Sequence, residues 1–189
     1  MAENIPPILL GDPGGPAAAP FPIGPISIGD DDLMQVLGDF IRLILADIQV
    51  IRGQDNRVPE PLANRFVKMT PSARRFLSTT THEEDGPNGR IYVARSTACD
   101  VQLDFFGAES ANDAQVFGTL FRDAYGCEAM DGTGVQPLHC DDGRQMPLVN
   151  GEKQYQDRWM IQASLQITPS VSTPGQFADS VTATIAEVD

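Results

Sequence analysis

The residues of this chain best suited to chemistry are few and lie in one short stretch. His139, Cys140, Asp141 and Asp142 follow one another directly, and the second histidine, His82, is distant in the sequence. A structural zinc site takes four ligands, usually from separated pairs, and adjacent residues cannot all converge on one ion. A nucleophilic Cys140–His139 pair is disfavoured because neighbouring side chains rarely reach the geometry that activation needs. We therefore expect a surface loop here.

The other candidates for catalysis or cofactor binding also have structural explanations. Asp30, Asp31 and Asp32 precede an apolar-periodic segment and are typical helix-capping residues. The glycine-rich stretches GDPGGP and MDGTG lack the Lys-Ser/Thr pair of a phosphate-binding loop. The sequence therefore predicts no catalytic residue, no cofactor and no metal, and we expect a non-enzymatic protein.

The three cysteines point to buried or inert thiols. Cys99, Cys127 and Cys140 are odd in number, widely spaced and free of any CxxC motif. No apolar run approaches the roughly 20 residues that span a bilayer, and residues 1–7 do not resemble a signal peptide. We expect a soluble protein that is synthesised in the cytoplasm, where disulfides are rare.

Charge is unevenly distributed along the 189 residues. The formal net charge is −13, which argues against non-specific binding to nucleic-acid phosphates. The segment Arg52–Arg75 is nevertheless net +4, so the remainder is −17. Two interpretations stay open: a solvated basic face, or a basic edge that meets an acidic edge of another copy. Salt separates them, because screening weakens a charge-steered contact.

The elements that must position these residues begin after a proline-rich arm. Residues 1–29 hold seven prolines and many glycines, so neither a helix nor a central strand is expected. Hydrophobic residues lie among the prolines and suit an extended segment that lies on a partner, although a merely disordered leader is the alternative. The predicted anchors of this arm are Ile8, Leu9, Leu10, Phe21 and Ile23.

Periodicity predicts the elements of a domain over residues 30–189. An amphipathic helix runs from Asp30 to about Ala46, a short strand follows at 49–51, and Gly53 ends it. Two further strands are expected at 65–71 and 74–81, with a hairpin tip at 83–89.

The second half of the domain is dominated by two long alternating segments. Residues 90–106 and 155–168 each predict one half-buried strand, with Asp100 and Asp104 on the solvent side of the first. Between them we expect a helix with Ala124 on its inner face and Gly126 as its terminating glycine, then an irregular stretch at 131–150. Residues 181–188 favour a last strand, with a short helix as the alternative. The predicted fold is α+β, a two-layer, antiparallel-rich sheet with two helices on one face.

From Asp30 onward the sequence resembles the neck or tail terminator proteins of tailed bacteriophages. The blocks that carry the resemblance are DDDLMQVLGDFIRLIL (30–45), VIRGQDNRVPEP (50–61), DVQLDFFG (100–107), FGTLFRDAYGC (117–127) and VQPLHCDDGRQMPLVNGEKQYQDRW (135–159). The proline-rich arm is not part of the resemblance.

The resemblance implies a structural role in the virion. Such proteins form a ring, commonly of six copies, that caps the tail tube and joins the tail to the head-completion proteins of the neck. The implied partners are other copies of the chain, the tail tube protein, the neck proteins and the tail sheath, with DNA only passing through the lumen and no membrane involved. The acidic balance is compatible with DNA that slides through without being gripped.

Two long polar stretches, 53–61 and 136–155, are the expected ring contacts, because an isolated domain has little use for them. The predicted interface residues are Arg52, Gln54, Asp55, Asn56, Arg57, Asp141, Asp142, Arg144 and Lys153. The alternative function is another phage neck or head–tail adaptor without a terminating role, for which a mainly helical fold would be expected.

Overall fold

The computed structural model describes residues 23–54, 61, 65–146, 148–149 and 155–175. The predictions for residues 1–22 and 181–188 therefore lie outside the described residues. None of the helices in the described part of the chain has the length and apolar character needed to cross a membrane.

Helix α1 (Asp30–Ile44) is confirmed where periodicity predicted it. Its apolar stripe is buried, including Leu37 and Ile41 at 0% exposure. The carboxylate of Asp32 accepts a hydrogen bond from the Gly29 amide at 2.8 Å, and the acidic first turn matches the positive end of the helix dipole. Capping and packing therefore agree on where this helix begins.

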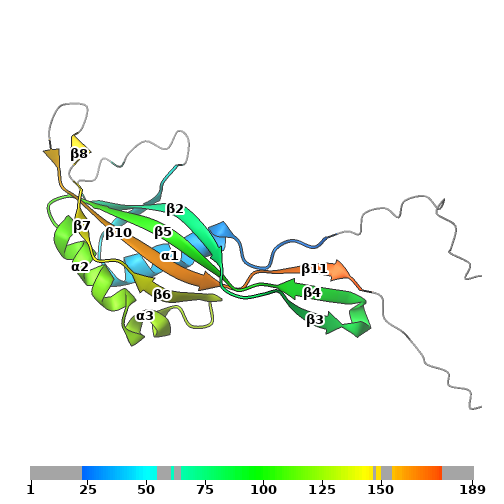
Figure 1. Ribbon diagram of the computed structural model, residues 1–189. Coiled ribbons are helices and arrows are strands. Elements are labelled where there is room, and N and C mark those ends of the chain that lie inside the picture. Colours follow the sequence, from blue (N-terminus) through cyan, green and yellow to red (C-terminus); the bar gives the residue numbers. More distant parts are fainter. Residues whose placement is uncertain (1–22, 55–60, 62–64, 147, 150–154, 176–189) are drawn as a thin grey trace, which may run out of the picture.

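The main sheet has the order β1-β2-β5-β10-β6, and β7 also pairs with β10. Its central strands are the antiparallel β5 (Thr97–Phe106) and β10 (Arg158–Ile167), joined in an unbroken ten-residue register. Strand β1 (Gln49–Arg52) lies parallel to β2 (Phe66–Phe76) at one edge, whereas β6 (Val135–Cys140) and β7 (Arg144–Gln145) form the other edge. Helices α1 and α2 (Ser110–Phe121) cover one face of this sheet (Figure 1). The α+β, antiparallel-rich fold is thus confirmed.

The apolar phase of each central strand forms the core against these helices. The buried residues on the two strands are Cys99, Val101, Leu103, Phe105, Ile161, Ala163, Leu165 and Ile167. Phe40 of α1 and Phe117 of α2 meet edge to face, with ring centroids 6.0 Å apart.

The predicted single strand over residues 90–106 is wrong. Strand β4 (Arg90–Ala94) ends two residues before β5 begins and belongs to a second sheet, of order β11-β4-β3. The chain passes between the sheets twice, at Arg95–Ser96 and again between β10 and β11 (Ser170–Pro174), where the Arg95 amide donates to the Pro169 carbonyl at 3.3 Å. The second sheet continues the line of β5 and β10 and projects from the main body (Figure 1).

The two strands expected at 65–71 and 74–81 are one strand, β2, with an irregularity between Pro71 and Ala73. Pro71 is tolerated because β1 pairs only with Phe66–Met69, so the proline lies where β2 has no neighbour on that side. The hairpin tip is shorter than predicted: β3 (Thr81–Asp85) already includes Glu83, and the turn is the 3-10 helix η1 (Gly86–Asn88).

The second predicted helix is also divided. α2 ends at Phe121, and a short α3 (Ala124–Ala129) follows, so Gly126 lies inside α3 rather than after a helix end. A Cβ at Gly126 would lie 2.9 Å from the Leu120 and Phe121 carbonyl oxygens, so only glycine allows this close approach. Ala124 is exposed rather than on the inner face.

The stretch 131–150, expected to be irregular, contains β6, β7 and the short β8 (Leu148–Val149), which pairs with β9 (Tyr155–Gln156). Pro137, which cannot donate a ladder hydrogen bond, weakened the strand signal of β6 in the sequence. The other long prediction, a strand within 155–168, is confirmed by β10.

Residues 23–28 run beside the second sheet before α1 begins. The Gly24 amide donates to the Ser172 carbonyl at 2.9 Å, and the Ser27 amide donates to the Ser170 carbonyl at 3.0 Å. Ile28 packs against the core, whereas Ile23, a predicted arm anchor, is 70% exposed.

Candidate functional site

The predicted interface residues divide between the two opposite edges of the main sheet. Arg52 and Gln54 lie at the β1 edge, and Asp141, Asp142 and Arg144 lie at the β6–β7 edge. The structure does not bring the two groups together within one chain. The other predicted residues, Asp55, Asn56, Arg57, Lys153 and the anchors Ile8, Leu9, Leu10 and Phe21, lie outside the described residues.

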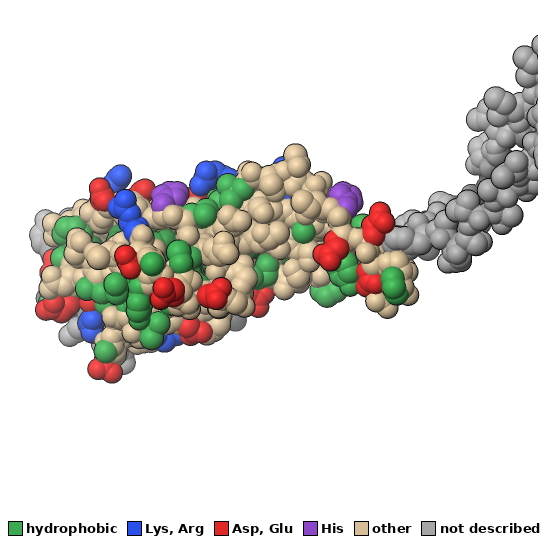
Figure 2. Space-filling view, turned by 90° about the horizontal axis from the view of Figure 1, so that it is seen from below, with side chains coloured by type: hydrophobic (Ala, Val, Ile, Leu, Met, Phe, Trp, Pro, Cys, Tyr) green, Lys and Arg blue, Asp and Glu red, His purple; other side chains and the backbone are tan. Residues whose placement is uncertain are grey.

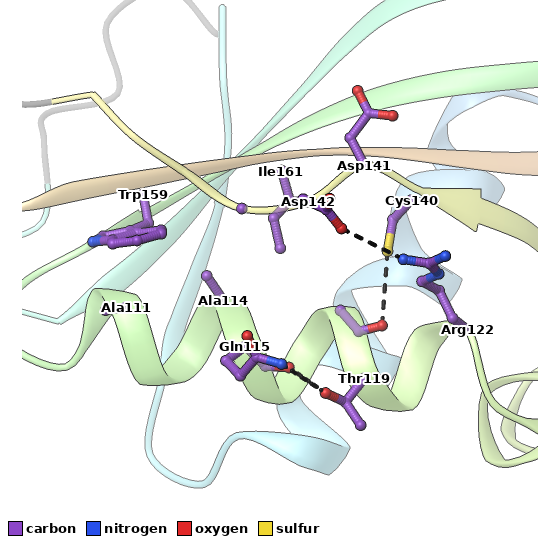
Figure 3. Close-up of a pocket in the computed structure, with 12 residues that line it drawn as sticks. Ala111, Ala114, Gln115, Thr119, Arg122, Cys140, Asp141, Asp142, Trp159 and Ile161 are labelled. Carbon is purple, nitrogen blue, oxygen red and sulfur yellow. Dashed lines mark hydrogen bonds and ion pairs between the residues drawn. The ribbon is translucent and has the colours of Figure 1, made fainter.

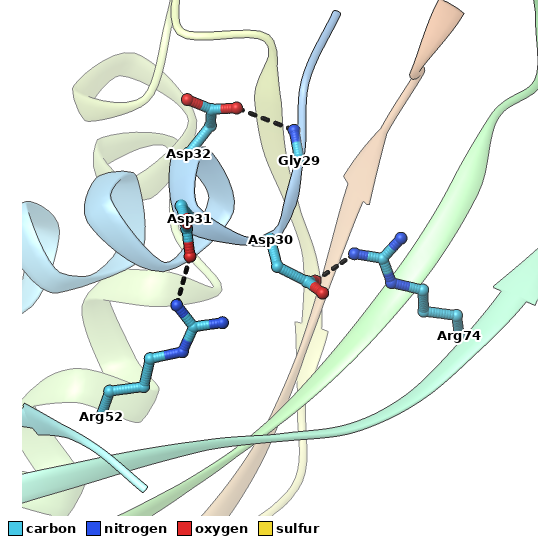
Figure 4. Close-up of polar contacts among 6 residues, drawn as sticks. All are labelled: Gly29, Asp30, Asp31, Asp32, Arg52 and Arg74. Atoms are coloured by element: carbon cyan, nitrogen blue, oxygen red, sulfur yellow. Dashed lines mark hydrogen bonds and ion pairs between the residues drawn. The ribbon is translucent and has the colours of Figure 1, made fainter. Parts of the chain in front are cut away.

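The β1 edge carries basic side chains that pair with the start of α1. Arg52 forms an ion pair with Asp31, and Arg74 of β2 forms one with Asp30 (Figure 4). Gln54, just beyond β1, is exposed with a positive φ of 66°. These contacts hold the acidic helix start against the sheet.

The basic segment is largely neutralised within its own chain. Arg65 donates to both carboxylate oxygens of the buried Asp113 at 2.9 and 2.6 Å, and these hydrogen bonds raise the pKa of Arg65 above its usual value. Arg75 approaches Asp100 at 3.7 Å. The net charge of +4 therefore does not describe a row of unpaired cations, which weakens a purely electrostatic account of assembly.

The β6–β7 edge is polar and exposed. Asp141 directly follows β6, and its amide donates to the Gln162 carbonyl at 2.9 Å. The Asp142 carboxylate lies 3.6 Å from the Arg122 guanidinium at the end of α2. Arg144 lies in β7, paired with Met160 of β10. The carboxylates of Asp141 and Asp142 thus lie at the edge of the sheet opposite Arg52.

A pocket of about 400 Å³ opens between this edge and α2. Its wall on α2 is made of small residues, and Trp159 and Ile161 of β10 face them (Figure 3). Gln115, Thr119, Arg122 and Asp142 supply a polar rim. The pocket is lined by Ala111, Ala114, Gln115, Gly118, Thr119, Arg122, Cys140, Asp141, Asp142, Gly143, Trp159 and Ile161.

The pocket was not predicted from the sequence, although the spacing of small residues in α2 indicated it. Ala111, Ala114 and Gly118 recur at intervals of three and four, which places three small residues on one helix face. The helical pattern directed attention to the large apolar residues of α2 instead.

The stretch around His139 and Cys140 has no geometry for catalysis. Neighbouring residues of a strand point to opposite faces, and Cys140 is buried whereas His139 is exposed. Burial raises the pKa of the Cys140 thiol, so the reactive thiolate is disfavoured. Within the described ranges, no group of three or more His, Cys, Asp or Glu side chains could hold a metal ion.

Asp104 was predicted to face solvent, and this is wrong. It lies on the outer side of β5 but is only 2% exposed, because the Arg158 guanidinium at 2.8 Å and the Gln102 amide at 2.9 Å cover its carboxylate. Beside it, the Phe66 and Phe106 rings stack with centroids 4.5 Å apart. The outer face of the sheet thus has its own small buried cluster.

The surface seen from below mixes hydrophobic and acidic side chains. Figure 2 shows hydrophobic side chains gathered between acidic ones on the main body, with the narrower second sheet extending from it. Across the described part of the chain, the exposed large hydrophobic residues include Leu43, Phe76, Val116, Tyr125 and Leu138. A surface of this kind is suited to contacts with other proteins.

Comparisons with known proteins identify a family for this chain. A family model described as phage neck terminator protein matches residues 31–189. Among solved structures, the chain is similar to the sheath/tube terminator of an extracellular contractile injection system in its extended state, with 11% identity and a TM-score of 0.43. That similarity covers 86% of this chain but only 65% of the other chain. No curated protein sequence matches this chain.

Proposed function

This chain belongs to the phage neck terminator family, and we propose that it forms a ring that caps the tail tube and joins the tail to the head-completion proteins. Family membership makes it a structural component of the phage tail with a tail-terminating role. The observation that carries the proposal is the family match, which spans almost the whole described domain. The ring, its six copies and its contact with neck proteins are the proposed part.

The position of the predicted contact residues supports a ring. In a head-to-tail interface, one surface of a copy meets a different surface of the next, and such contacts generate rings when the rotation closes. Arg52 and Gln54 lie at one sheet edge, and Asp141, Asp142 and Arg144 lie at the other. We infer that the β1 edge of each copy contacts the β6–β7 edge of its neighbour.

The internal ion pairs are compatible with this contact. Arg52 and Arg74 pair with exposed carboxylates, and exposed pairs contribute only about 0–1 kcal/mol. A neighbour's carboxylates can therefore replace or share these partners at little cost. The internal pairs also keep the unassembled copy from exposing an unpaired basic edge.

The remaining partners follow from the same proposal. Tail tube, tail sheath and neck proteins would contact the faces of the ring, and the exposed second sheet is a surface for such a contact. The net charge of −13 is compatible with a lumen through which DNA slides without being gripped. The proposed place of the protein is the tail–neck junction of the virion. The alternative, a mainly helical neck adaptor, is not favoured by a domain built on an extended sheet.

A charge-swap experiment tests the ring. One variant carries Arg52→Glu and Arg57→Glu, and the other carries Asp141→Arg and Asp142→Arg. Each variant alone should stay folded but fail to form rings on tail tubes, because like charges meet at every contact. An equimolar mixture should restore rings of alternating copies, since both kinds of contact are again complementary. Electron microscopy and light scattering give the readout.

Two outcomes would contradict the proposed contact: rings formed by either variant alone, or a mixture that fails while both variants remain folded. The equimolar mixture is itself the control, because it contains the same substitutions as the two variants alone. In the phage itself, loss of this protein should yield tails of irregular length that lack heads. Tails of normal length joined to heads would argue against termination.

A further inference from the structure

The pocket between α2 and the β6–β7 edge has the form of a peptide-binding site. Gly118 and Gly143 leave space beside large apolar side chains: a Cβ at Gly118 would lie 3.7 Å from Ile161 Cδ1, and one at Gly143 would lie 3.4 Å from Trp159 Cε3. Apolar walls with a few polar rim groups are typical of ligand pockets. Aromatic-lined grooves in particular bind proline-rich segments in the polyproline II conformation.

The chain itself contains a segment of matching chemistry. Residues 5–22 read IPPILLGDPGGPAAAPFP, with prolines interspersed among apolar side chains. Proline restricts the free segment, so binding costs less conformational entropy than for an ordinary chain. The arm therefore matches this pocket in hydrophobic character.

The course of residues 23–27 indicates which copy provides the arm. Ser27 lies beside Ser170 and Gly24 beside Ser172, so towards its N-terminus the chain follows β11 away from β10. The pocket lies at the opposite end of β10, beside Trp159. An arm of 22 residues spans about 68 Å as polyproline II, which is long enough to reach a neighbouring subunit.

We propose that residues 1–22 of one copy dock in the α2 pocket of an adjacent copy. This inference rests on the proposed ring only for the presence of the adjacent copy, whereas the pocket belongs to each single chain. The arm would then link copies through a contact beside the paired sheet edges, since Asp141 and Asp142 belong both to the pocket lining and to the β6–β7 edge.

Disulfide trapping in full-length chains tests which copy the arm reaches. One copy carries Leu9→Cys and its partner, made heavier by a tag, carries Gln115→Cys at the pocket rim, both with the exposed Cys127 replaced by serine and the pocket-lining Cys140 replaced by alanine. In the mixed assembly we expect a cross-link between the two copies, at least about tenfold above the same experiment with Gln35→Cys on α1. Adding Gly118→Met to the receiving copy should remove it by filling the pocket. A cross-link that forms only when both cysteines are in one chain would overturn the proposal.

A peptide titration separates failure of docking from failure of the ring. Trp159 is the only tryptophan of the chain, so its fluorescence reports on this pocket. A synthetic peptide of residues 4–22, added to dilute full-length protein, should shift the emission saturably. A tethered arm has an effective concentration of about 1 mM, so affinity in that range suffices. A peptide with serine at Ile8, Leu9, Leu10 and Phe21 is the control.

Failure of docking and failure of the ring give different results. A specific peptide response in protein that forms no rings would sustain the pocket as the docking site while overturning the proposed function. Rings that form normally, with neither a peptide response nor a cross-link above the control, would overturn the docking proposal and leave the proposed function intact.

Discussion

Arginine side chains of the basic segment pair with carboxylates of their own chain. Four arginines of the basic segment have carboxylate partners in their own subunit, from the buried Asp113 to the exposed Asp31. Sequence alone could identify the excess of basic residues but not these partners, because each pair joins positions more than 20 residues apart. The same limit explains why Asp104 was expected in solvent: its partner, Arg158, is 54 residues away.

The pair between Asp104 and Arg158 predicts a large effect of one substitution. Asp104→Ala should lower the free energy of unfolding by about 3 kcal/mol, because it leaves a partly buried guanidinium without its carboxylate. Urea unfolding followed by circular dichroism measures it. Asp39→Ala, which removes a pair with both side chains well exposed, should cost less than about 1 kcal/mol. Replacing both partners, as Asp104→Leu with Arg158→Met, should recover much of the loss. Equal, small losses in Asp104→Ala and Asp39→Ala would contradict this prediction.

Helices and strands whose own residues carry the full pattern could be predicted from the sequence. Elements whose limits depend on a neighbouring strand or helix could not. Helix α1 combines capping carboxylates with an apolar stripe, and β10 alternates without interruption, so both were predicted correctly. The change of sheet at Arg95–Ser96 is marked in the sequence only by Arg95, a charged residue on the apolar phase, while the period of two continues from β4 into β5. Likewise, β6 could be identified as a strand only from its pairing with β10. The pocket was missed for a related reason, because it exists only where α2 faces β10.

Two glycines of neighbouring helices should respond oppositely to the same substitution. Gly118→Ala should raise the free energy of unfolding by up to about 1 kcal/mol, because alanine favours the helix and its Cβ has room at 3.7 Å. Gly126→Ala should lower it by about 2 kcal/mol, because the new Cβ would meet two backbone oxygens at 2.9 Å. Thermal unfolding of both variants gives the comparison. Destabilisation of similar size in both would contradict the different spaces at these sites.

The described part of the molecule is a domain with a main sheet, a projecting three-stranded sheet and the short pair β8–β9, preceded in the sequence by the proline-rich residues. The described residues show that the arm is attached earlier than expected: residues 24–27 already pair with β11, and Ile28 contacts the core. A truncation that tests the arm should therefore remove residues 1–22 rather than 1–29. The boundary at residue 29 remains a proposal from composition.

Removal of residues 1–22 should leave the unfolding midpoint nearly unchanged but weaken assembly. In the proposed ring each copy loses one contact with its neighbour, so we expect rings to dissociate at lower salt or greater dilution than rings of the full chain. Sedimentation across a salt series measures this. Equal stability of both rings would reduce the arm to a passive leader.

The two crossings between the sheets have a mechanical consequence. Strand β4 leads into β5, and β10 leads into β11, along one common line, so a pull on the second sheet travels along the backbone into the ten-residue ladder of β5 and β10. Hydrogen bonds in an antiparallel ladder lie perpendicular to the strands. Because Thr97 of β5 pairs with Ile167 of β10, the load pulls both strands from the same end and shears their outer ladders with β2 and β6 rather than the ladder between them, which makes the two strands a single tension-bearing element of the subunit.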